Sequence, residues 1–424
     1  MANVTANPVL VAPEAIDQHA IQSRVVRVLA AGQILGGVGV ASGAAVGAVL
    51  AADLSSDAFS GLAAASANIG AALVALPVAR LMSDRGRRPG LLLAYIVGIV
   101  GCILIIVGAQ SRMFPLALAG LFLFGGGTTA TLQSRYAATD LARPENRGRS
   151  LGIVVWATTI GSVLGPNLSG PTGRLAESVN LPKLAGPYLM SITVFIIAFA
   201  VIWVFLRPDP LLTAKSLLAP GTTHPRIGYK TALGVIREHQ SAVLGLASMV
   251  LGHMVMVSVM SMTPVHMDHE GASLQIIGFV ISGHISGMYV ASPLVGMATD
   301  RYGRRLVIVA GGVILLMSFL IAGTAPPGAH LQLGFGLFLL GLGWSCTLIA
   351  GSTLLTESVP FNTKPGVQGA ADLTMGIFGA TAGLLAGVVV GFSSYAVLTI
   401  VATCLILPLM AATLKSPRRV AQAV

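Results

Sequence analysis

The sequence Gly296-Met-Ala-Thr-Asp300-Arg301-Tyr-Gly303-Arg304-Arg305 forms a charged segment directly after a long apolar block. A shorter version, Ser83-Asp84-Arg85-Gly86-Arg87-Arg88, follows an apolar block in the first half of the chain. The two aspartates are separated by about half the length of the chain. This repeat predicts that the protein consists of two related halves.

The composition around these segments is too apolar for a soluble enzyme. Of 424 residues, 54% are hydrophobic and only 9% are charged, whereas roughly a quarter are charged in a soluble domain. The apolar residues fall in blocks of about 20, the length that crosses a bilayer. We therefore expect an all-α polytopic membrane protein. Its twelve predicted spans are 28–52, 58–80, 89–109, 114–134, 150–172, 185–206, 241–264, 273–297, 306–324, 331–355, 366–390 and 394–414.

The distribution of positive charge predicts the orientation of these spans. The chain has 25 lysines and arginines and a formal net charge of +10. All of them except Arg112, Arg174 and Lys183 fall on one side of the predicted spans. Basic loops remain in the cytoplasm, so we expect both termini there. Because the positive charge is explained by the orientation of the spans in the membrane, no nucleic-acid partner is expected.

One polar connection divides the spans into two groups of six. Residues 207–240 form this connection, which is rich in proline and is interpreted as a cytoplasmic linker. We expect an N-terminal six-helix bundle at 24–206 and a C-terminal six-helix bundle at 241–415. Cytoplasmic tails are expected at 1–23 and 416–424, and the first lacks the cationic start and short apolar core of a signal peptide.

The segment at 300–305, Asp-Arg-x-Gly-Arg-Arg, resembles the signature of the major facilitator superfamily, and the resemblance extends over residues 25–415. It implies two pseudo-symmetric six-helix bundles with a substrate path between them. A charged cluster beside a glycine turn can latch two halves in one state and release them in another, although the arginines could also serve topology alone. The expected gating residues are Asp84, Arg85, Arg88, Asp300, Arg301 and Arg304.

Sulfur and imidazole side chains are concentrated in the seventh and eighth spans. Residues 249–297 contain eight of the 15 methionines and four of the eight histidines. The two spans are joined by a short loop, so we expect them to pack as antiparallel neighbours. Helical spacing places Met249, His253, Met256 and Met260 on one face of the seventh span, and His284 and Met288 on one face of the eighth.

This set of side chains favours copper as a ligand. Thioethers suit Cu(I) and imidazole suits copper in general, whereas zinc usually takes thiolates, imidazoles or carboxylates. Alternatively, the methionines have a structural role and only fill gaps in an apolar core. An intramembrane histidine, however, is usually functional. We expect copper as a transported substrate and no permanently bound cofactor. The predicted ligands are Met256, Met260, His284 and Met288, and a relay or entrance is predicted at Met249, His253, His266, Met267 and His269.

The motifs Met256-x-x-x-Met260 and His284-x-x-x-Met288 also resemble the paired metal motifs of the CcoA-like bacterial copper importers, a branch of the same superfamily. This resemblance implies a secondary transporter of the bacterial inner membrane that imports copper by alternating access. It also implies that these four residues bind the substrate. Relatives in this branch are associated with riboflavin uptake, so the resemblance leaves riboflavin open as a substrate.

Other features leave further alternatives open. A glycine-proline segment at 161–170 resembles a motif of drug/proton antiporters and favours a proton-coupled transporter of drugs or small molecules. Asp372 is interpreted as a proton carrier, or equally as a helix cap or a partner of the loop arginines. Arg135 is interpreted as a snorkelling or structural charge.

A non-transporting membrane metal sensor is an alternative of another functional class. An enzyme is not expected, and the protein is expected to be a monomer.

Overall fold

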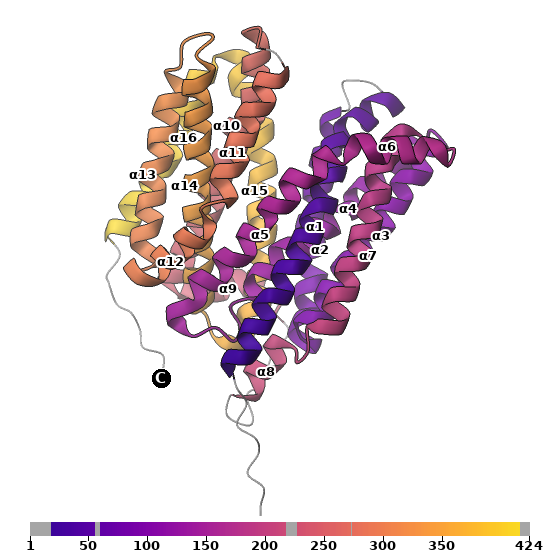
Figure 1. Cartoon of the computed structure of the whole chain (residues 1–424). Coiled ribbons are helices and arrows are strands. Elements are labelled where there is room, and N and C mark those ends of the chain that lie inside the picture. Colours follow the sequence, from indigo (N-terminus) through magenta and orange to yellow (C-terminus); the bar gives the residue numbers. More distant parts are fainter. Residues whose placement is uncertain (1–17, 56–59, 218–226, 273, 416–424) are drawn as a thin grey trace, which may run out of the picture.

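The computed structural model describes residues 18–55, 60–217, 227–272 and 274–415. Within these ranges the chain consists of helices joined by turns and short connections. Figure 1 shows two groups of long helices that meet at one end and diverge toward the other. The predicted all-α fold is confirmed. Most of the predicted tails and part of the predicted linker lie outside the described residues.

The first group of helices comes from the first half of the chain and has its own hydrophobic core. Gly86, with φ of 93°, separates its second and third helices, and a glycine adopts this backbone conformation readily. The helices are α1 (Gln18–Leu54), α2 (Ser60–Arg85), α3 (Arg87–Gln110), α4 (Phe114–Ala137), α5 (Arg147–Asn167), α6 (Ser169–Ser178) and α7 (Gly186–Phe205).

The second group comes from the second half and has a second core. Gly303, with φ of 91°, occupies the turn that corresponds to Gly86. The helices are α10 (Gln240–His269), α11 (Leu274–Tyr289), α12 (Ser292–Tyr302), α13 (Arg304–Gly323), α14 (His330–Glu357), α15 (Lys364–Phe392) and α16 (Tyr395–Lys415). Two short helices, α8 (Pro210–Ser216) and α9 (Tyr229–Glu238), lie between the groups in sequence.

The helices are long and apolar enough to cross a membrane many times. In the described part of the chain, 11 helices meet this criterion, or up to 12 when a bent pair is counted as one span. That pair is α5 and α6, which are bent by 49°, next to Pro166. A proline removes a helical hydrogen bond and clashes with the preceding turn, which explains the bend. The predicted span at 150–172 is therefore broken rather than continuous.

The prediction that spans seven and eight pack as close neighbours is wrong. Helices α10 and α11 each pack extensively against α14 and contact one another at only a few positions. Glycines allow the α11 and α14 backbones to approach closely, because a side chain at Gly287 would meet the backbone of Phe338 and one at Gly341 would meet the backbone of His284. Helix α14 therefore contributes side chains between the two helices that carry the predicted metal ligands.

Candidate substrate site and gate

The two bundles are joined at the end that carries the two arginine-rich turns, which we call the gate end. Asp300, near the end of α12, accepts hydrogen bonds from the backbone N–H groups of Gly148 at 2.9 Å and Arg149 at 2.7 Å. These donors belong to the first turn of α5, where unpaired N–H groups and the helix dipole favour a negative charge. Asp300 therefore holds the C-terminal bundle against the N-terminal bundle.

Small residues let the backbones of the two bundles touch at the gate end. A side chain at Gly152 in α5 would meet the α12 backbone at Ser292. On the other side of the interface, a side chain at Gly369 or Gly376 in α15 would meet Ala79 or Ala72 of α2. Helix pairs α5–α12 and α2–α15 thus close this end of the molecule, the lower end in Figure 1.

A second element of the gate is an ion pair in the C-terminal bundle. Arg304 pairs with Glu357 at the end of α14 at 2.8 Å, and its guanidinium lies 3.5 Å from Asp300. It also donates to the carbonyl oxygen of Pro144 in the other bundle at 2.6 Å. Glu357 lies 3.4 Å from Arg147 of α5. The predicted gating residues Asp300 and Arg304 are therefore part of one network that crosses the interface.

In the N-terminal bundle the equivalent residue is Arg87, which the sequence prediction did not include. Arg87 is completely buried, pairs with Asp140 at 2.7 Å, and donates to Gln368 of the other bundle at 2.7 Å. It occupies the same place in its turn as Arg304, so the repeat could have identified it. Arg88 instead lies with its guanidinium over the ring of Trp203.

Three further predicted gating residues lie at the surface. Asp84 and Arg85 are exposed at the end of α2. Arg301 is also exposed, and its guanidinium lies 5.4 Å from the centre of the Tyr302 ring. Among the residues of this turn, the structure shows a hydrogen bond across the bundle interface for Arg87.

A buried ion pair links α4 and α15 across the interface. Arg135 and Asp372 are 2.5 Å apart, and their side chains are only 2% and 1% exposed. Gln133 donates to the second carboxylate oxygen of Asp372 at 2.9 Å, and the Arg135 guanidinium covers the Tyr136 ring. Arg135 is thus not a snorkelling charge, and Asp372 pairs with an arginine of α4 rather than with a loop arginine.

His284 presents an unused nitrogen inside the C-terminal bundle. Its side chain is 2% exposed, and its Nδ1 lies 2.9 Å from the carbonyl oxygen of Leu337 in α14. A carbonyl only accepts, so Nδ1 carries the hydrogen and Nε2 carries the lone pair. Nε2 is buried without a hydrogen-bond partner among the described residues. A histidine whose other nitrogen donates to a backbone carbonyl is arranged as metal-binding histidines are.

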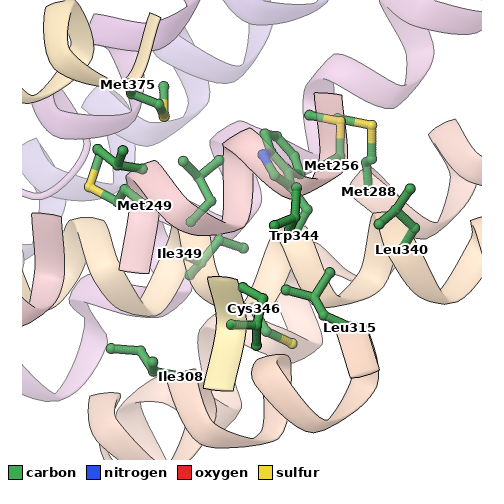
Figure 2. Close-up of a cluster of buried hydrophobic side chains, with 14 of the residues drawn as sticks. Met249, Met256, Met288, Ile308, Leu315, Leu340, Trp344, Cys346, Ile349 and Met375 are labelled. Carbon is green, nitrogen blue, oxygen red and sulfur yellow. The ribbon is translucent and has the colours of Figure 1, made fainter. Parts of the chain in front are cut away.

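Two predicted thioether ligands belong to the same buried core. Met256 of α10 and Met288 of α11 are 6% and 8% exposed. Figure 2 shows their side chains directed toward one another near Trp344. Met260, one turn beyond Met256, is partly buried against the same core. Predicted ligands from α10 and α11 thus lie in one hydrophobic core, although the two helices share few contacts.

His253 is engaged differently from His284. Trp344 of α14 donates its indole N–H to Nδ1 of His253 at 3.2 Å, so that nitrogen has no lone pair left for a metal. The hydrogen of neutral His253 therefore resides on Nε2, which faces Gly379 of α15. Trp344 also makes an edge-on ring contact with Tyr289 at 5.8 Å. Sequence reasoning missed Trp344 because its contact with His253 joins residues far apart in the chain.

The remaining predicted relay residues lie toward both ends of α10. Met249 is buried and accepts a 3.5 Å hydrogen bond from Ser352 at its sulfur. His266 lies 3.2 Å from Glu270 and stacks on the ring of Tyr395. Met267 is fully buried. The side chain of His269 lies outside the described part of the structure.

Clusters of histidine, cysteine and carboxylate side chains are absent from the described ranges. Over residues 18–55, 60–217, 227–272 and 274–415, no group of three histidine, cysteine, aspartate or glutamate side chains is placed to hold an ion.

Comparison with known proteins places the chain among membrane transporters. The family model of the Major Facilitator Superfamily matches residues 28–282 and 244–423. The uncharacterized MFS-type transporter YdeG of Bacillus subtilis is 37% identical over 385 residues, covering 91% of this chain and 90% of YdeG. The riboflavin transporter RfnT of Brucella anthropi is 25% identical over 315 residues, covering 74% and 75%. The human organic anion transporter MFSD10 shares the fold, with a TM-score of 0.72 at 17% identity over 92% of this chain and 99% of MFSD10.

Proposed function

The chain belongs to the major facilitator superfamily, and on this premise we propose that it is a secondary transporter that imports copper by alternating access. The superfamily and the fold support transport across a bilayer. The copper substrate is our proposal, and it depends chiefly on one observation. Nε2 of His284 carries a buried lone pair that has no hydrogen-bond partner in the described part of the chain. The bond from Nδ1 to Leu337 fixes this lone pair on the helix that also carries Met288.

The proposed ligand set combines one imidazole with thioethers. We assign Nε2 of His284 and the sulfurs of Met256 and Met288 to the bound ion, with Met260 as the ligand one turn nearer the outer end. When the bundles move, the ion would leave the sulfur of Met260 and bind sulfurs deeper in the membrane, such as that of Met249. Such a neutral set suits Cu(I), because soft thioether sulfur binds it without needing a charged ligand.

The proposed direction of transport follows from charge and closure together. The gate end carries the arginine-rich turns and is assigned to the cytoplasm of a bacterial cell by the positive-inside rule, with both termini there. In this orientation the structure is closed toward the cytoplasm and its bundles diverge toward the outside, as Figure 1 shows. A monomer with this arrangement would accept copper from outside and release it inward after the gate opens.

Asp372 is the proposed carrier of a coupling proton. Opening the gate would separate α15 from α4 and thus Asp372 from Arg135, its partner at 2.5 Å. A buried carboxylate without its partner is costly as an anion, so protonation would stabilise the separated state. Copper entry would then be coupled to the entry of a proton.

A small aromatic molecule is the second candidate substrate. The rings of Trp344, Tyr289 and His253 form a connected cluster on α14, α11 and α10, and the relative RfnT is a riboflavin transporter. The drug/proton antiporter alternative is less favoured, because Gly161 and Gly165 of its motif pack against the backbone of α1 and are explained by helix packing. A non-transporting sensor would bind metal without moving it.

Uptake of radiolabelled copper and of riboflavin in the same expressing cells tests the proposal. His284→Ala and the double variant Met256→Leu, Met260→Leu should lose copper accumulation while their amounts in the membrane stay normal. Met254→Leu is the matched control, because it removes a thioether from the same helix on another face. Normal copper uptake in both ligand variants would refute the copper assignment. Riboflavin uptake that tolerates them would favour the second candidate, and metal binding without uptake would favour the sensor.

A further inference from the structure

Arg135 has hydrogen-bonding capacity that the bundle interface does not use. Its Nη2 is bonded to Asp372 and to Tyr136. Its Nε and Nη1 are buried without a partner among the described residues. Unmade bonds of a buried charged donor are unfavourable, so their persistence in a native fold calls for an explanation. A ligand present in another part of the transport cycle would provide one.

A second donor lies further along the same interface. The bond from Trp344 to Nδ1 of His253 leaves Nε2 as an N–H donor beside Gly379. His253 is partly exposed. Residues 372 and 379 of α15, which contact Arg135 and His253, are about two turns apart on one helix face, or roughly 10 Å.

We propose that these donors bind a carboxylate-bearing organic anion, either as the free acid or as the chelating ligand of a copper ion. The N–H donors of Arg135 and His253 lie about two helical turns apart, and the ring of Trp344 contacts the rings of both His253 and Tyr289. This arrangement suits an elongated acid with an apolar part better than a single small ion. This inference rests on the proposed function only in that a substrate passes between the bundles. It does not depend on the methionine ligands.

Binding of an anion at Arg135 would also affect the gate. The guanidinium holds Asp372 of the opposite bundle through Nη2. An anion that binds the same guanidinium competes with Asp372 for its charge and weakens one of the bonds that close the gate end. Substrate binding would thereby favour opening of the gate, because a ligand shifts an equilibrium through its differential affinity for the two states.

Tryptophan fluorescence of the full-length purified protein provides the test. The chain has three tryptophans, and in a Trp156→Phe, Trp203→Phe background only Trp344 reports, through its bond to His253. We would titrate citrate, the copper–citrate complex and inorganic phosphate. A saturable change with citrate alone assigns a free organic acid, and a change with copper–citrate only assigns a chelate. Both outcomes support the proposal.

Arg135→Lys separates anion binding from closure of the gate. Lysine keeps a positive charge near Asp372 but lacks the two unpartnered guanidinium donors, so citrate or its copper complex should bind at least about tenfold more weakly. Arg112→Lys is the matched control at an exposed arginine of the opposite end. The affinity of this variant for citrate or its copper complex should be unchanged. No fluorescence change with either carboxylate probe, a response to phosphate alone, or equal affinity in Arg135→Lys would overturn the proposal. Loss of copper uptake in the methionine variants with citrate binding intact would leave it standing.

Discussion

Replacing Asp300 with asparagine should shift the protein from the closed-gate arrangement toward the opposite one. The carboxylate accepts two backbone N–H bonds from the first turn of α5, at 2.9 and 2.7 Å, and its side chain is only 7% exposed. An asparagine presents one oxygen and one NH2 group to these two donors. One bond is therefore lost and a donor is left facing another donor.

The size of this shift follows from two losses, one hydrogen bond and the negative charge at the N-terminus of α5. An unmade buried hydrogen bond costs about 1–3 kcal/mol, and loss of the negative charge at a helix N-terminus costs about 0.3–1 kcal/mol. Because Asp300 is largely buried, solvent screening reduces these values little. A total of about 1.3–4 kcal/mol corresponds to a shift of roughly 10- to 900-fold in the ratio of the two states.

A distance measurement between the outer ends of the bundles checks this prediction. Spin labels at Leu175→Cys and Leu331→Cys, both exposed positions of opposite bundles, would be placed in a Cys404→Ser background, because Cys404 is the exposed native cysteine. Asp300→Asn should add a population with a shorter distance, and transport should fall while copper binding stays measurable. Asp53→Asn, an exposed acid at the outer end, is the control. An unchanged distance distribution together with reduced transport would refute a gating role for Asp300.

Three further variants test other parts of the structure. Gly152→Val should wedge α5 away from the backbone of α12 and add the same short outer distance, as measured with the same labels. Arg87→Gln should lower stability by about 3–5 kcal/mol in thermal unfolding, because it leaves Asp140 buried without its partner, and removing both charged groups should restore part of the loss. His253→Phe should reduce the binding of free copper ion to the purified protein far less than His284→Ala, since Nδ1 of His253 is already bonded. Equal losses in the two histidine variants would contradict the assignment of ligands.

Sequence alone predicted the features that depend on local composition. Blocks of about 20 apolar residues predict membrane helices because an isolated segment must satisfy its own backbone hydrogen bonds in lipid. The repeated turn around Gly86 and Gly303 predicted two halves, and both glycines have the positive φ that a tight turn needs. Asp300 and Arg304 were predicted as gating residues from the same repeat, and the structure places them at the interface between the halves.

Only the tertiary structure decided which helices and charges meet. Helix α14 packs against both α10 and α11, so Trp344 reaches His253, and Leu337 fixes the tautomer of His284. Arg135 and Asp372 are separated by 237 residues and still form a buried pair. Spacing along a helix specifies which side chains share a face, but it carries no information about the helix opposite. That choice depends on how two whole bundles pack, through backbone contacts at small residues and through charges that are stable in the interior only when paired.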